Sequence, residues 1–189
     1  MPLRVMSWCA GLLATAWTMG AVASPITVDV HARANSSSGG TGVSTFSLAT
    51  GDLFTAYAAP GDLWSAGALP RWSNADGLVG DLFATGSDES GAPAGTKIGQ
   101  NFGLWTQNGL SAPYGSLVGE IGGIYQLLGS SFSGPAWNTG MLKLYYWDSN
   151  NADNTQFVTV RLDRTAVPEP ASVALLGLAL VAAASARRR

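Results

Sequence analysis

The side chains best suited to chemistry lie in one short loop, residues 148–154, with the sequence DSNNADN. Calcium takes about six to eight oxygen ligands from carboxylates, amides and carbonyls, although Asp, Asn and Ser are also the residues that turns prefer. The loop therefore predicts either a calcium site or an ordinary polar turn. It is not an EF-hand, because the position of the bidentate Glu falls on Thr159. The loop offers two carboxylates and three amides: Asp148, Asp153, Asn150, Asn151 and Asn154.

Catalytic chemistry finds little support in the sequence. The single histidine, His31, lies on the outward face of an expected strand, and residues 24–166 contain no cysteine. Neither a G-x-S-x-G nucleophile elbow nor an H-E-x-x-H metal motif occurs. A glycosidase needs only two carboxylates at a set separation, but the spacing of the acidic residues does not favour one. We therefore expect no enzyme, and a polysaccharide hydrolase is the weakest alternative.

Tryptophan side chains are a second possible means of binding sugars, because aromatic faces stack on sugar rings. Large rings are seldom fully exposed, so a core position is the expectation for most of them. Trp72 lies in a polar, turn-rich stretch at 71–77, and we expect it to be the most exposed and a candidate sugar contact. The tryptophans between residues 24 and 166 are Trp64, Trp72, Trp105, Trp137 and Trp147.

Short strands must position these side chains. Residues 26–30 alternate apolar and polar, 156–162 place three apolar side chains on one face, and 141–147 is short and aromatic. Clusters of Gly, Pro, Asn and Asp separate such runs, and three Gly-Asp-Leu-aromatic segments starting at 51, 61 and 80 resemble turns that lead into strands. We expect an all-β fold over 24–166, an antiparallel sandwich or jelly roll.

Both ends of the chain are typical of export signals rather than of a folded domain. Residues 1–23 combine a charged start, a short apolar run and an A-x-A cleavage site, which predicts a secretory signal peptide. At the other end, Pro168, Glu169 and Pro170 precede an apolar stretch at 171–186 and three arginines. Sixteen helical residues reach about 24 Å, close to the thickness of a bilayer core, so we expect a transmembrane helix at 171–186.

The C-terminal arrangement resembles the PEP-CTERM sorting signal of exopolysaccharide-producing bacteria. Pro168, Glu169 and Pro170 form the motif, and the apolar stretch and basic tail follow in the expected order over 167–189. The resemblance implies recognition by an exosortase, a membrane protease that removes the helix. It also implies an exported protein that is transiently anchored in the inner membrane and ends in the cell envelope or outside the cell. A plain C-terminal membrane anchor is the alternative.

The region between the two signals resembles the PA-I galactophilic lectins, which are small calcium-dependent β-sandwich proteins. The resemblance is carried by GSLVGEIG at 115–122, NTG at 138–140, the aromatic strand that ends in Asp148, and the Asp153-Asn154 pair before FVTV. TGD at 50–52 and LW at 63–64 fit the same pattern.

The lectin resemblance implies a function for the polar loop. It places the calcium ligands at Asp148, Asp153 and Asn154, with backbone carbonyls from the loop and from the turn after Trp64 completing the sphere. Sugar hydroxyls in that family bind the ion directly, so Asp148 and Asn154 would also contact sugar. The sequence departs from the family pattern because the stretch 71–77 has no counterpart of the sugar-contacting His and Gln.

Charge excludes one class of partner. Residues 24–166 contain six Lys or Arg and eleven Asp or Glu, for a formal net charge of −5, whereas nucleic-acid binding requires clustered cations. We therefore expect an exported, calcium-dependent carbohydrate-binding protein that acts on exopolysaccharide or envelope glycans. The alternative is a structural surface or matrix protein with the same sandwich and no sugar site.

Overall fold

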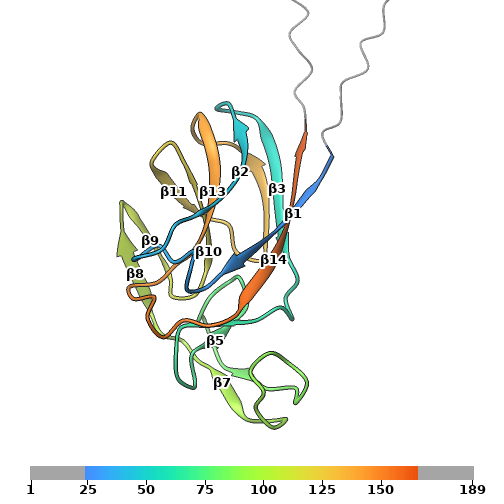
Figure 1. Cartoon of the computed structure of the whole chain (residues 1–189), viewed down its shortest axis with the longest axis vertical. Helices are drawn as coiled ribbons and strands as arrows, with labels where there is room; N and C mark the ends of the chain where they lie inside the picture. The colour runs from blue at the N-terminus through green and yellow to red at the C-terminus, as the bar shows by residue number, and fades with distance from the viewer. Residues whose placement is uncertain (1–23, 166–189) are drawn as a thin grey trace, which may run out of the picture. The chain divides into compact units, whose positions relative to one another are not determined.

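Two antiparallel four-stranded sheets form the domain. The computed structural model describes residues 24–165, so the expected signal peptide and the expected helix at 171–186 lie outside the described residues. One sheet has the strand order β1-β14-β3-β12 and the other β11-β10-β13-β2, and both are visible in Figure 1. The bounds are β1 Ile26–His31, β2 Val43–Leu48, β3 Leu53–Ala58, β10 Leu117–Ile121, β11 Ile124–Leu127, β12 Ser131–Pro135, β13 Gly140–Tyr146 and β14 Phe157–Thr165.

The core lies between the two sheets. Alternate residues of β3 and β14 face inward from one sheet, and alternate residues of β10 and β13 face inward from the other. The expected all-β sandwich is therefore confirmed, including the expectation that Val158, Val160 and Leu162 share the buried face. Within residues 24–165, no helix has the length and the hydrophobicity that a bilayer crossing requires.

Three small hairpins occupy the chain between β3 and β10. Each of the Gly-Asp-Leu-aromatic segments leads into a strand as expected, because β3, β4 and β6 begin at their Leu or aromatic residue. The hairpin of β8 and β9 covers the outer face of β10, where Val118 packs with Ala112 and Trp147. The hairpin strands are β4 Trp64–Ser65, β5 Trp72–Ser73, β6 Leu82–Phe83, β7 Lys97–Gly99, β8 Leu104–Gln107 and β9 Leu110–Pro113.

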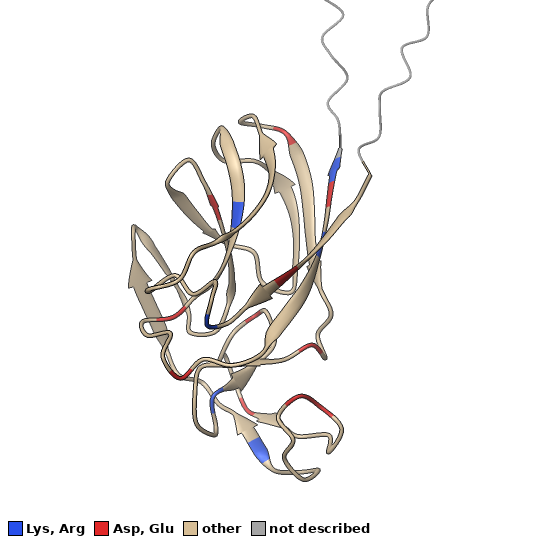
Figure 2. Ribbon diagram, in the orientation of Figure 1, with Lys and Arg blue, Asp and Glu red and all other residues tan. Residues whose placement is uncertain are grey.

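The pairing of β1 with β14 determines where the polar loop lies. Ile26 pairs with Leu162 at one end of these strands, and His31 pairs with Phe157 at the other. Loop 148–154 therefore lies at the His31 end of the domain, opposite Ile26 and Thr165. Figure 2 shows Lys and Arg as separate segments spread over the domain.

Candidate functional site

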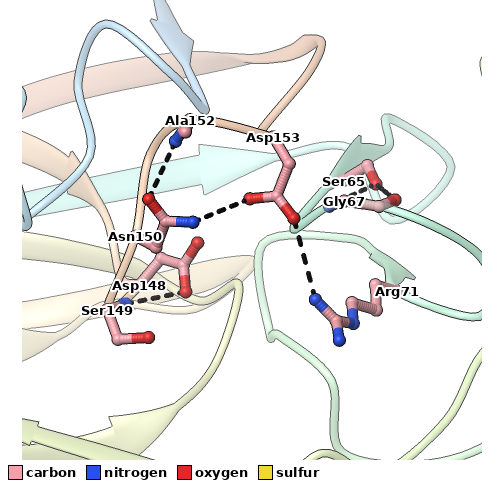
Figure 3. A network of polar contacts seen from close by, with 8 residues as sticks. All are labelled: Ser65, Gly67, Arg71, Asp148, Ser149, Asn150, Ala152 and Asp153. Atoms are coloured by element: carbon pink, nitrogen blue, oxygen red, sulfur yellow. Dashed lines mark hydrogen bonds and ion pairs between the residues drawn. The ribbon is translucent and has the colours of Figure 1, made fainter.

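Asp148 is held at the end of β13 by a segment from the other end of the chain. The Ser37 hydroxyl accepts a hydrogen bond from Asp148 N at 3.1 Å and donates one to Asp148 O at 3.0 Å. The residue is only 5% exposed. One carboxylate oxygen accepts a 2.7 Å hydrogen bond from Ser149 N, as Figure 3 shows. Asp148 is therefore a buried acid with a fixed backbone.

Asn154 is buried beside it with an oxygen that has no partner. Its amide nitrogen donates to Ala32 O at 3.2 Å, whereas Oδ1 has no hydrogen-bond partner among the described residues. The Tyr146 hydroxyl is buried and unpartnered in the same way. A buried polar atom without a partner costs about 1–3 kcal/mol. An unsatisfied oxygen of Asn154 beside the Asp148 carboxylate is what a bound cation would satisfy.

Asp153 forms the exposed side of the cluster. Figure 3 shows it between Asn150, whose amide donates to it at 3.3 Å, and Arg71, whose guanidinium lies 3.7 Å from its other oxygen. The turn after Trp64 lies against it as well, because a Cβ added to Gly67 would overlap Asp153 Oδ2. The structure thus brings together the loop and the turn from which the lectin resemblance draws its ligands.

Electrostatics at the cluster favour a positive ion. Burial raises the pKa of Asp148, and the nearby charge of Asp153 adds to this, while hydrogen bonds from Ser149, Asn154 and Asn150 oppose it. Burial, together with the same two carboxylates, also raises the pKa of the Tyr146 hydroxyl well above its ordinary value. A cation among these oxygens would offset the repulsion and the lost hydration.

The types of oxygen at the cluster restrict the choice of cation. Within residues 24–165, no three His, Cys, Asp or Glu side chains gather into a metal-binding group. A site here would combine two carboxylates with amide and backbone oxygens. This all-oxygen set suits a hard cation such as Ca²⁺, whereas zinc sites usually contain Cys or His ligands.

Trp72 is not the exposed ring that its polar surroundings predict. It is half-buried in β5, where it packs on a small core of Leu63, Ala84 and Ile98. Within the described residues it makes no hydrogen bond to Asp148, Asp153 or Asn154. The expectation of exposure was wrong because β5 pairs with β4 and lies against β7. A sugar contact by Trp72 stays a prediction.

Two residues beside the cluster were not identified from the sequence. His31 and Gln156 line an open hollow of about 570 Å³ that Asn154 also lines. They are 125 positions apart, and the pairing of His31 with Phe157 brings them together. The one available signal was the chain order, because His31 ends the first strand and Gln156 precedes the last.

Gly67 provides a direct test of the packing around Asp153. Its φ is +117°, so Gly67→Ala introduces backbone strain as well as the contact with Asp153. We expect about 1–3 kcal/mol of destabilisation from the strain and, in addition, displacement of the Asp153 carboxylate. Gly51→Ala is the matched control, because Gly51 has a φ of +92° and nothing within 4 Å. Both variants should unfold more easily in urea, but only Gly67→Ala should weaken calcium binding measured by calorimetry. Equal calcium affinities of Gly67→Ala and Gly51→Ala would contradict a role for Asp153 as a calcium ligand.

Comparisons with known proteins gave two matches of different extent. Residues 166–189 match the PEP-CTERM protein-sorting motif, which indicates an exported protein and confirms the expected signal at Pro168, Glu169 and Pro170. A solved structure described as the EclA N-terminal domain, a PllA-like lectin, is similar with a TM-score of 0.44 and 16% sequence identity. That alignment covers 74% of this chain and 95% of that structure. The comparison with curated proteins found no match.

Proposed function

We propose that this chain is an exported lectin-like protein that binds Ca²⁺ through Asp148, Asp153 and Asn154 and binds a glycan at the same site. The observation that carries the proposal is the buried Asp148 carboxylate next to the unpartnered Asn154 Oδ1. Without a cation, this arrangement keeps a desolvated charge and an unsatisfied acceptor in the same place. With Ca²⁺, both become ligands.

The position of the site suits a ligand as large as a saccharide. Asp153 is half-exposed, and the hollow beside Asn154 is open to solvent. A Ca²⁺ ion at this edge would retain coordination positions on its outer side. Vicinal sugar hydroxyls are neutral oxygen donors of the kind that such positions accept. The protein's own residues hold and orient the ion, and the ion supplies the contact to the sugar.

Export and processing complete the proposal. The sorting motif supports delivery to the cell envelope, with an exosortase as the processing partner. The glycan would then be an envelope or exopolysaccharide component. If the site holds Ca²⁺ but no glycan, the domain is instead a structural surface or matrix protein.

The test is a calcium titration of the full-length protein by calorimetry, followed by a glycan array with and without a chelator. We expect one Ca²⁺ per chain and glycan binding that the chelator removes. No calcium binding would refute the proposal. Calcium binding without any glycan signal would support the matrix-protein alternative instead.

A further inference from the structure

The hollow of about 570 Å³ next to Asn154 lies where the end of β1 meets the start of β14. Its lining combines amide, hydroxyl and cationic side chains. Amides and hydroxyls can hydrogen-bond to sugar hydroxyls, and a cation can pair with a sugar carboxylate. The residues that matter here are His31, Arg33, Asn151, Asn154, Thr155 and Gln156.

The lining carries positive charge in an otherwise acidic domain. It includes Arg33 and no Asp or Glu. Four of the six described cations form ion pairs with carboxylates, and Arg164 is held by Ser47 O and the Phe46 ring. Among residues 24–165, Arg33 is therefore the one cationic side chain with neither an ion pair nor a hydrogen bond. Its exposed guanidinium is available to a ligand.

The backbone of the hollow is fixed. Gln156 has a φ of +68°, which is unusual for a residue other than glycine, and its carbonyl accepts a 2.9 Å hydrogen bond from Ala32 N. Strained residues of this kind concentrate at ligand sites. Beside it, the His31 ring packs against Phe157 with centroids 5.0 Å apart. This pair gives the rim an aromatic surface of the kind that packs on sugar rings.

We propose that this hollow is a subsite for an acidic sugar, a uronic-acid residue of the glycan. Arg33 would pair with the sugar carboxylate, and the Asn151 and Gln156 amides would bind its hydroxyls. The inference rests on the proposed function, because Asn154 belongs to both sites and a saccharide on the Ca²⁺ could extend into the hollow. It names the substrate class as an anionic polysaccharide.

The test compares trigalacturonic acid with its methyl ester, which has the same backbone without the charge. Full-length wild type, Arg33→Gln and Arg161→Gln would be titrated by calorimetry in calcium. Arg161 is the matched control, because it is an exposed arginine on β14 that pairs with Asp163. We expect wild type and Arg161→Gln to prefer the acid about tenfold, the usual size of a charge-assisted hydrogen bond, and Arg33→Gln to lose the preference.

The outcomes separate this inference from the proposed function. Equal binding of acid and ester by the wild type, binding of neither, or a preserved preference in Arg33→Gln would each overturn the acidic subsite. Calcium binding by Arg33→Gln should remain normal, which also shows that the variant is folded. Failure of the proposed function is seen separately, because wild type would then show no Ca²⁺ binding in a titration without any oligosaccharide.

Discussion

Asp148→Asn is expected to abolish Ca²⁺ binding and, at the same time, to raise the melting temperature of the calcium-free protein. The substitution removes a carboxylate ligand but also a buried, unpaired charge, which should stabilise the calcium-free fold by about 1 kcal/mol, or roughly 3 °C. Wild type should gain about 2.7 kcal/mol, roughly 8 °C, when free calcium is about 100 times the Kd. Thermal melts with and without calcium measure both effects.

The pH dependence of the calcium-free protein checks the cause. Burial raises the pKa of Asp148 above its ordinary 3.8, so the folded chain binds this proton more tightly than the unfolded chain. Wild-type stability should therefore fall as the pH rises from about 3.8 through the raised pKa, and this decline should be absent in Asp148→Asn. Hydrogen bonds to Asp88 lower its pKa to about 2, so its effect lies below that window and has the opposite sign.

Asp163→Asn serves as the control for the Asp148 substitution. Asp163 lies on the other sheet, near the far end of β14, where its partially exposed carboxylate pairs with Arg161. Exposed pairs contribute about 0–1 kcal/mol, so this variant should keep the calcium-induced rise in melting temperature. If Asp148→Asn also kept that rise, Asp148 would not be a ligand.

Trp64→Ala is expected to cause the largest loss of stability. The ring is fully buried and packs edge-on against Tyr146 at 4.5 Å, and its indole nitrogen donates to Gly115 O at 2.8 Å and Asn74 O at 3.1 Å. Removing it leaves a cavity and two carbonyls without their donor. We expect a loss of about 3–5 kcal/mol in urea unfolding, which lowers the melting temperature by roughly 12 °C.

Trp105→Ala is the comparison for Trp64→Ala. Trp105 is half-buried at the edge of the small core under the β8–β9 hairpin. The hydrogen bond that its backbone carbonyl accepts from the Trp147 indole survives the substitution. Trp105→Ala should therefore lose about half as much unfolding free energy as Trp64→Ala. If Trp64→Ala does not fold, Trp64→Phe keeps one aromatic ring in the core, and its smaller loss combines a smaller cavity with the lost hydrogen bonds, which contribute about 1–3 kcal/mol. Equal losses of unfolding free energy in Trp64→Ala and Trp105→Ala would contradict the prediction that Trp64 contributes more to stability.

Local sequence pattern was enough to predict several of the strands and the position of the polar loop. The alternation in 156–162 corresponds directly to the buried face of β14, because side chains in a strand alternate strictly between its two faces. The loop was likewise recognisable, since Asp148 and Asp153 are both carboxylates and lie close together in the sequence. Local pattern could not show that Asp148 is buried, because Ser37, which hydrogen-bonds to its backbone, comes from a distant segment.

Features that depend on long-range pairing were missed. Arg33 has no distinguishing neighbour in the sequence, and its proposed role depends on its having no ion pair within residues 24–165. The meeting of His31 with Gln156 depends on the register of β1 against β14. Trp72 illustrates the opposite error, because its polar neighbours in sequence conceal the small apolar core that it contacts in space.

The pairing of β1 with β14 also determines how far the polar loop lies from the two ends of the described domain. Ile26 and Thr165 lie at one end of this strand pair and the polar loop at the other, and the eight residue steps from Phe157 to Thr165 span about 26 Å. An attachment at Thr165 would therefore leave the loop about one strand length away from the point of attachment. The surface around the loop would then stay free for a ligand whether or not the domain is attached there.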